Sequence, residues 1–234
     1  MMRALNIALI AVLLTGCSSG GGTNPVLSAV WQKIKPGSRA AARELQAEQA
    51  ARTPIVLTFQ KIQDTGLAII RARVGDDTRG ALLYARSLND DYVTYASQLQ
   101  QTLTLRGSLI TASRAIDTDL LALRSDANDP VAVLTKPADW PAQVSRDYHI
   151  AGDGPSGTVY SVTCQLTEGP AFELELLDKV FDTQIMQDKC SGDGVSFTNI
   201  HLVQANGQIL RSAQWLGPQQ GTIEIDILEP FTTD

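Results

Sequence analysis

The stretch from residue 206 to residue 228 reads NGQILRSAQWLGPQQGTIEIDIL, and it decides the fold class. Its last seven residues, TIEIDIL (222–228), alternate isoleucine with acidic residues. Successive side chains of a strand point to opposite faces, so this pattern indicates a strand with one buried and one solvated face. Asn206 and Gly207 lie between two strand-like runs, which is a strong signal for a tight β-hairpin.

Short runs rich in β-branched and aromatic residues continue toward the N-terminus, separated by polar residues and glycine. The runs that we predict as strands cover residues 55–59, 67–74, 81–85, 92–95, 103–105, 143–150, 158–167, 171–180, 197–204 and 209–214. Residues 115–124 instead predict one or two helical turns, and residues 126–130 predict a turn. Residues 54–234 are therefore expected to form a mainly β domain, an antiparallel sandwich or a barrel-like sheet.

The N-terminus has the layout of a signal peptide. Arg3 precedes an apolar run over residues 4–14, which is too short to cross a bilayer. Thr15 and Gly16 directly before Cys17 form a lipobox, the pattern that lipoprotein signal peptidases recognise. We predict removal of residues 1–16 and a lipid anchor on Cys17, palmitate among its chains; an ordinary signal peptide that ends near a cysteine is the alternative.

Residues 17–24 are a Ser/Gly-rich stretch that predicts a flexible, lipidated tether. Ser18 follows the cysteine where Asp would indicate retention at the inner membrane, so in a two-membrane bacterium we expect the outer membrane, facing the periplasm. Two or three acyl chains hold a protein at a bilayer far more firmly than one. Residues 25–53 predict a short helical N-terminal segment, amphipathic over 25–35 and rich in Ala, Glu, Gln and Arg over 39–52.

Composition narrows the function classes. The net charge of −6 argues against a nucleic-acid partner, and 44% hydrophobic residues describe a folded globular chain. Once Cys17 carries lipid, Cys164 and Cys190 remain, and an even pair in an exported protein predicts a disulfide. Closing that loop of about 26 residues would stabilise the fold by roughly 3.5 kcal/mol on a chain-entropy model. Two buried free thiols are the alternative.

Motifs that carry chemistry are missing from the sequence. His149 and His201 are the two histidines, and neither has a histidine or cysteine at the spacing of a metal site. Glu173 and Glu175 alternate along a predicted strand, where a solvated face explains them better than a glycosidase pair. We therefore predict no catalytic residues, no metal and no cofactor.

The aromatic residues offer candidates for binding. The candidate contacts for a glycan ring or a protein partner are Trp140, Trp215 and Tyr148. A tryptophan in a chain with 6% aromatic residues is more often part of the core, and this is the alternative for each.

Most of the mature chain resembles a known family, the YjbF/GfcB lipoproteins, also called group 4 capsule polysaccharide lipoproteins. The closing Ser-x-Gln-Trp-x-Gly-Pro stretch is the most specific part of the resemblance. The residues that carry it are LRGSLITASR (105–114), DLL (119–121), Cys164, Cys190, FTN (197–199) and NGQILRSAQWLGP (206–218). The family usually has Gly-Leu where this chain has Ala115 and Ile116.

The resemblance implies an all-β outer-membrane lipoprotein that assists secretion or assembly of a capsule or exopolysaccharide. It carries over no catalytic residue, so we expect an accessory or scaffold protein and not an enzyme. The expected partner is an outer-membrane polysaccharide export protein, contacted through exposed strand edges or residues 39–52. A periplasmic glycan-binding module is the alternative, and a polysaccharide-modifying enzyme ranks below both.

Overall fold

The structure, a computed structural model, describes residues 56–75, 80–116, 118–152 and 157–232. The predicted signal peptide, the lipidation site Cys17, the tether and the helical segment 25–53 lie outside these residues. Val56–Asp234 forms one compact unit, which is described here by itself. Among the described residues, no helix is long and apolar enough to cross a membrane.

Strands dominate this unit, and the helices are short. The helical elements are α3 (Phe59–Gln63), α4 (Pro130–Val133) and the 3₁₀ turn η1 (Pro137–Asp139). The strands are β1 (Ile69–Val74), β2 (Ala81–Asn89), β3 (Tyr92–Ala96), β4 (Thr102–Arg106), β5 (Leu109–Arg114), β6 (Leu120–Ser125), β7 (Gln143–Ile150), β8 (Thr158–Leu176), β9 (Lys179–Gly192), β10 (Val195–Val203), β11 (Ile209–Gly217) and β12 (Gly221–Glu229).

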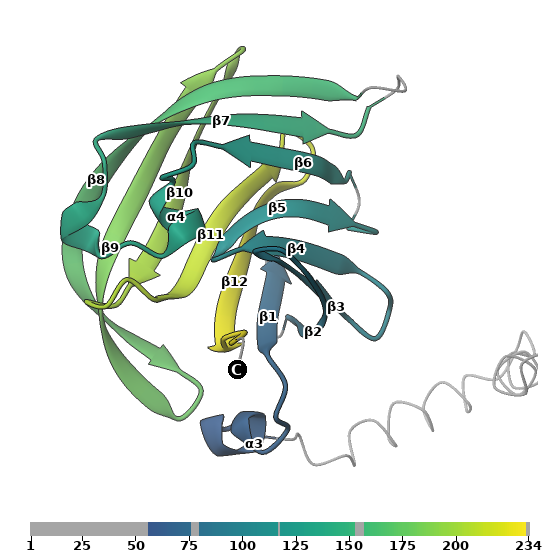
Figure 1. The fold of residues 1–234 in the computed structure, drawn as a ribbon, viewed down its shortest axis with the longest axis vertical. Coiled ribbons are helices and arrows are strands. Elements are labelled where there is room, and N and C mark those ends of the chain that lie inside the picture. Colours follow the sequence, from purple (N-terminus) through teal and green to yellow (C-terminus); the bar gives the residue numbers. More distant parts are fainter. Residues whose placement is uncertain (1–55, 76–79, 117, 153–156, 233–234) are drawn as a thin grey trace, which may run out of the picture. The chain divides into compact units, whose positions relative to one another are not determined.

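The strands form one antiparallel sheet whose hydrogen-bonded order is β5-β4-β3-β2-β1-β12-β11-β10-β9-β8-β7-β6. Every neighbour is also a neighbour in sequence except β1 and β12, which pair the two ends of the strand series. The sheet curls until β5 and β6, its two edges, lie side by side (Figure 1). This nearly closed barrel confirms the predicted mainly β fold and selects the barrel over the sandwich.

The seam between β5 and β6 is joined by hydrogen bonds from side chains to the backbone, where neighbouring strands elsewhere in the sheet are joined by backbone–backbone hydrogen bonds. Arg114 of β5 donates to the carbonyl oxygens of Leu120 and Leu121, at 3.0 and 3.3 Å. The backbone N–H of Leu120 donates to the Ser113 hydroxyl at 2.9 Å. Backbone groups that a sheet edge would leave bare are thereby paired across the gap.

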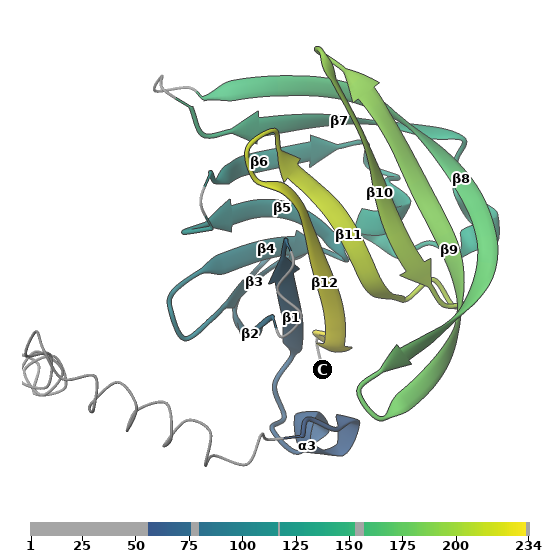
Figure 2. The same cartoon turned by 180° about the vertical axis from the view of Figure 1, so that it is seen from behind.

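The main core fills the inside of the barrel, and a second core lies on its outside. The isoleucines of the quoted stretch, Ile223, Ile225 and Ile227, point inward and are 0%, 0% and 8% exposed. Figure 2, seen from behind, shows β12, the strand that contains these isoleucines, beside β11 in the barrel wall. The acidic residues between them point outward, as the alternation predicts.

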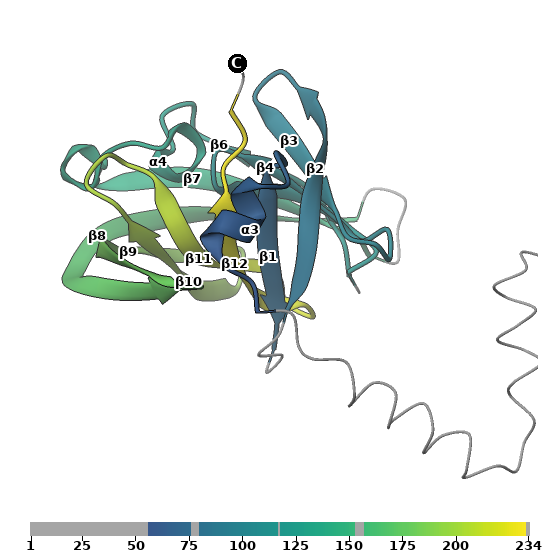
Figure 3. The ribbon, with the colours of Figure 1, turned by 90° about the horizontal axis from the view of Figure 1, so that it is seen from below.

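The outer core joins α3 to the end of the β8–β9 hairpin. Phe59 and Ile62 of α3 pack with Leu174 and Leu176 of β8, and the Phe59 ring meets Phe181 edge-on at 5.4 Å. Figure 3 shows α3 lying beside β1 and β12. This hairpin extends past its neighbours, because β7 pairs with β8 only to Gln165 and β10 pairs with β9 only from Gln184.

Two local predictions are wrong, and both have a physical reason. Residues 120–125 form a strand instead of helical turns. A bulge between Leu120 and Ala122 places Leu120 and Leu123 on the same buried face, which gives a strand the three-residue spacing of a helix. The strand predicted over residues 55–59 does not form in its described part: residues 56–58 belong to no strand and α3 begins at Phe59, where the Thr58 side chain caps the N–H of Lys61.

The predicted strand over residues 171–180 contains a hairpin turn. Leu177 adopts a φ of 54° between β8 and β9, so the chain reverses at a residue that is rarely found in this conformation. Conversely, Gly169 and Pro170 do not end a strand: β8 continues through a bulge between Glu168 and Ala171. The Asn206-Gly207 hairpin between β10 and β11 is confirmed, with Gly207 at a φ of 94°.

Candidate functional site

Residues 126–142, which connect β6 to β7 and contain α4 and η1, fold into one end of the barrel; we call them the plug segment. Val131 and Ala132 of α4 are 0% and 6% exposed and belong to the inner core. The plug segment packs against two turns at this end. A side chain at Gly107 or Gly207 would collide with the carbonyl oxygen of Ala132 or Leu134, respectively.

A buried ion cluster of Asp129, Arg146, Asp188 and His201 ties the plug segment to the barrel wall. All four side chains are fully buried. The Arg146 guanidinium donates to both carboxylate oxygens of Asp129, at 2.7 and 3.0 Å, and to Asp188 at 2.6 Å. His201 Nε2 lies 3.0 Å from the same Asp188 oxygen.

The ionisation of the cluster follows from these contacts. Burial opposes charge on Asp188, but the neighbouring His201 and Arg146 outweigh it and hold the pKa of Asp188 well below its usual range. Burial also opposes charge on Arg146, and the two carboxylates outweigh it and raise its pKa. The charged groups of the cluster therefore neutralise one another inside the protein.

Two of the three candidate aromatic contacts lie inside the barrel. Tyr148 and Trp215 are 1% and 8% exposed, and their rings meet edge-on at 5.0 Å. Trp215 also stacks on Phe197 at 4.2 Å, and Tyr160 completes the group at 6.0 Å. Because these rings are covered on several sides, they form a core cluster. Tyr148 and Trp215 therefore do not form a surface platform for a glycan ring or a protein partner.

The third candidate, Trp140, is half-buried at the end of the plug segment. Its Nε1 donates to the carbonyl oxygen of Thr135 at 3.0 Å, and its ring lies 5.9 Å from that of His201. Trp140 therefore helps to seat the plug segment.

The remaining polar residues singled out from the sequence lie apart from one another. Glu173 and Glu175 are exposed on the face of the β8–β9 hairpin opposite to the outer-core residues Leu174 and Leu176. His149 is half-buried and lies on β7 one residue away from inward-facing Tyr148, while His201 belongs to the ion cluster. Within the part of the chain that the structure describes, no group of three or more His, Cys, Asp or Glu side chains could hold a metal ion.

The two cysteines of the β domain lie opposite each other. Cys164 of β8 and Cys190 of β9 are register partners, and a disulfide with an S–S distance of 2.06 Å joins them. Both are buried, at 0% and 1% exposure, inside the barrel. The bond therefore fixes the register of the longest hairpin from its buried face.

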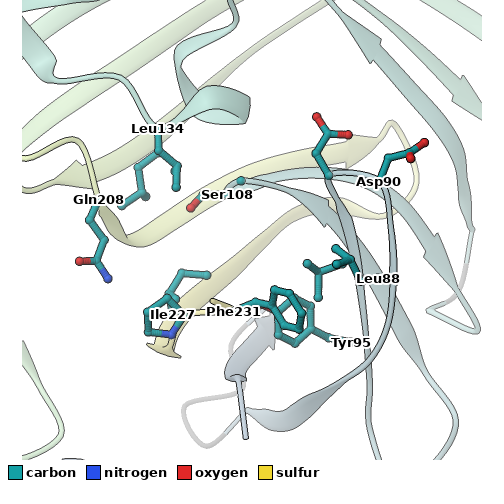
Figure 4. Close-up of a pocket in the computed structure, with 13 residues that line it drawn as sticks. Leu88, Asp90, Tyr95, Ser108, Leu134, Gln208, Ile227 and Phe231 are labelled. Atoms are coloured by element: carbon teal, nitrogen blue, oxygen red, sulfur yellow. The ribbon is translucent and has the colours of Figure 1, made fainter. Parts of the chain in front are cut away.

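An open cavity of about 340 Å³ lies at the same end of the barrel as the plug segment; we call it the end pocket (Figure 4). Leu88 and Asp90 line one side, Leu134 and Gln208 line the opposite side, and the rings of Tyr95 and Phe231 lie between them. The remaining lining residues are Asp91, Val93, Gly107, Ser108, Ile209, Ile227 and Pro230.

The end pocket has a buried aromatic residue in its wall and acidic residues at its mouth. Tyr95 is 4% exposed; burial raises its pKa to about 12, although a backbone hydrogen bond from Phe231 opposes the rise. Asp91 forms an ion pair with Arg106, and Asp90 stands beside it in the β2–β3 turn. The local excess of charge is therefore negative.

The residues that carry the resemblance have structural roles. Gln214 reaches across the barrel interior from β11, donating to the carbonyl oxygen of Ser108 at 2.7 Å and accepting from the N–H of Ile110 at 3.0 Å. The N–H of Trp215 donates to the Asn199 side chain at 2.8 Å. The Gln-Trp pair thus links three parts of the barrel.

Sequence reasoning missed the ion cluster and the end pocket. One signal was present: in the run QVSRDYHI (143–150), Arg146 shares a face with Val144, Tyr148 and Ile150. A cation on the apolar face of a strand requires a buried anion. Its partners Asp129 and Asp188 lie in a turn and in a strand that was not predicted, so the pairing left no local pattern.

Fold and sites together define the class: a β domain with a nearly closed antiparallel barrel, a packed interior, a plug at one end and a pocket beside it. Residues 42–228 match the family described as group 4 capsule polysaccharide lipoprotein gfcB, YjbF, and the chain belongs to this family. This confirms the family that the sequence resembles.

Comparison with solved structures supports the fold. The chain is similar to the crystal structure of the hypothetical lipoprotein YmcC from Escherichia coli K12, with a TM-score of 0.64 and 14% sequence identity over 85% of this chain and 100% of that one. At this identity the likeness shows a shared fold. No curated protein matches the chain.

Proposed function

We propose that this chain is an outer-membrane lipoprotein that assists secretion or assembly of a capsule or exopolysaccharide as a non-catalytic accessory protein. The observation that carries the proposal is the family match over residues 42–228, whose description names capsule polysaccharide and a lipoprotein. The lipobox at Cys17 supports the anchor, and Ser18 supports the outer membrane.

The interior chemistry supports a non-catalytic role. An acid or base that acts on a substrate needs a path to that substrate. Arg146, Asp129 and Asp188 are fully buried, and the two carboxylates bind the same guanidinium. These groups stabilise the barrel and hold the plug segment in place.

A strand edge is the less favoured of the two candidate contacts for a partner. The end of the β8–β9 hairpin, beyond Gln165 of β8 and before Gln184 of β9, is one stretch of described strand that lacks a neighbour on its outer side. This ribbon exposes Glu173, Glu175 and Asp182 beside the apolar Phe172 and Val180, and charged residues along an edge oppose the addition of a further strand. Residues 39–52 remain the proposed docking segment for an export protein.

A deletion strain tests the proposal. We expect loss or retention of the polymer inside the envelope, measured as surface polysaccharide, and restoration by the full chain. A membrane pull-down with the full chain as bait is expected to recover an outer-membrane export protein. The matched control is bait that lacks residues 39–52. Normal surface polysaccharide in the deletion strain, in a host that makes the polymer, would contradict the role.

A further inference from the structure

The end pocket has the size and the lining of a small-ligand site. Pockets that bind small molecules occupy about 300–1,000 Å³ and combine an apolar lining with a few polar groups. This one encloses about 340 Å³, enough for one sugar residue with part of its neighbour. Three of its rim residues, Leu88, Leu134 and Phe231, are large apolar side chains at 44%, 40% and 37% exposure.

The polar groups stand where sugar hydroxyls could reach them. Asp90 and Gln208 lie on opposite sides of the mouth, and the Phe231 ring, which is 37% exposed, lies between them (Figure 4). Carboxylate and amide oxygens accept hydrogen bonds from hydroxyl groups, and an aromatic ring packs against the apolar C–H face of a pyranose. Ile209 and Ile227 add an apolar floor.

Charge decides which sugars fit. Asp91 is balanced by Arg106, which leaves Asp90 as the excess charge at the mouth, and the chain as a whole carries −6. An acidic sugar would meet like charge, so an uncharged sugar is favoured. Among uncharged sugars, an N-acetylated one adds an amide for Gln208 and a methyl group for the apolar side chains of the pocket.

We propose that the end pocket binds an uncharged, N-acetylated hexose unit of a polysaccharide. This inference rests on the proposed function, because it supplies a contact between the accessory protein and the exported polymer. It assigns that contact to the β2–β3 turn, the plug segment and the C-terminal residues Pro230 and Phe231.

Calorimetric titration of the detergent-purified full chain tests the site with three trisaccharides of similar size. The probes are tri-N-acetylchitotriose, cellotriose, which lacks the acetamido groups, and trigalacturonic acid. We expect chitotriose to bind with a Kd of about 1 mM or below, and cellotriose at least about fivefold more weakly. We expect no measurable binding of the acidic trimer.

Two variants locate the binding. Leu88→Trp places a bulky ring in the mouth and is expected to weaken chitotriose binding at least about tenfold. Its matched control is Leu99→Trp, at an 81% exposed position in the β3–β4 turn, with unchanged binding. Asp90→Asn keeps the shape, and Asn tolerates the φ of 52° at this position, so the fold is retained while affinity falls about threefold or more.

Three results would overturn the site: no binding of chitotriose at 10 mM, tighter binding of trigalacturonic acid, or equal losses in both tryptophan variants. The deletion strain separates this inference from the proposed function. If surface polysaccharide is lost on deletion but restored fully by Leu88→Trp and Asp90→Asn, the accessory role stands and the sugar site falls.

Discussion

Arg146 is the residue whose removal should cost the most stability. Its guanidinium holds Asp129 of the plug segment and Asp188 of β9, and all three side chains are fully buried. Removing one partner of a buried ion pair leaves an uncompensated charge, which typically costs about 3–5 kcal/mol. Arg146→Leu should therefore lower the free energy of unfolding by about this amount in urea denaturation followed by tryptophan fluorescence.

The control for this prediction is Arg86→Leu, on the exposed part of β2. It removes the same charge from the surface, where substitutions usually change stability by less than about 0.5 kcal/mol. If the two replacements lowered the free energy of unfolding equally, the prediction that the buried ion cluster makes Arg146 important for stability would be wrong.

Asp226 predicts how stability depends on pH. Its side chain is fully buried on the outer face beneath Arg71, Arg73 and Arg211. Burial alone would raise its pKa, but hydrogen bonds from Arg211, Arg73 and Arg71 hold it below the usual value. The folded state then binds fewer protons than the unfolded state in the pH window between the lowered pKa of folded Asp226 and the unfolded-state pKa of about 3.9. Stability therefore rises with pH across this window and is lost as pH falls through it.

Urea denaturation between pH 6 and pH 2 checks this sign. The loss of stability below about pH 4 should be smaller in Asp226→Asn than in the wild-type chain. The exposed Asp182→Asn should keep the wild-type slope. A slope in Asp226→Asn as steep as in the wild type would place the acid sensitivity elsewhere, with Asp188 the next candidate because its pKa is also lowered.

At the scale of elements, the seam is the part of the barrel that should open first. β5 and β6 meet through Arg114 and Ser113, where other neighbours share a full ladder of backbone hydrogen bonds. A typical hydrogen bond contributes about 0.5–1.5 kcal/mol. Replacing both residues by alanine should speed hydrogen exchange at the Leu120 amide by roughly tenfold or more, since each 1.4 kcal/mol is a factor of ten.

Arg124→Ala on the same strand is the comparison for the seam, because Arg124 is exposed on β6. Exchange at the amides of β11 and β12 should stay slow in every variant. Uniform acceleration across the whole sheet would mean that the replacements destabilise the barrel globally and that the seam does not open on its own.

The elements also show what sequence reasoning reached. The alternation in TIEIDIL and the Asn206-Gly207 turn were read correctly, because both are local signals. The bulge in β6 changed the spacing of Leu120 and Leu123, and the turn at Leu177 lacked glycine, so those regions were misread. The end pocket left no local pattern, because Leu88, Leu134, Gln208 and Phe231 come from four distant parts of the chain.

At the scale of the whole molecule, the proposed anchor makes a direct prediction. Cys17→Ala removes both the acceptor for the lipid and the cysteine of the lipobox, so the chain should shift from the acylated, processed form to a heavier, unprocessed form that carries no palmitate label. Immunoblotting and palmitate labelling measure the shift, and sucrose-gradient separation of the two membranes measures where the wild-type chain resides. A wild-type chain that is already soluble, with a mature start other than Cys17, would contradict the anchor.

The side-chain hydrogen bonds across the seam between β5 and β6 have a consequence for copies of the chain that lie close together. Proteins confined to a surface encounter their own copies far more often than proteins diffusing freely in a volume, and a bare strand would then template the growth of fibrils from one copy to the next. With Arg114 covering the carbonyls of Leu120 and Leu121, the seam offers neighbouring copies little unpaired backbone. Dense packing on a bilayer is thereby compatible with each copy remaining a separate molecule.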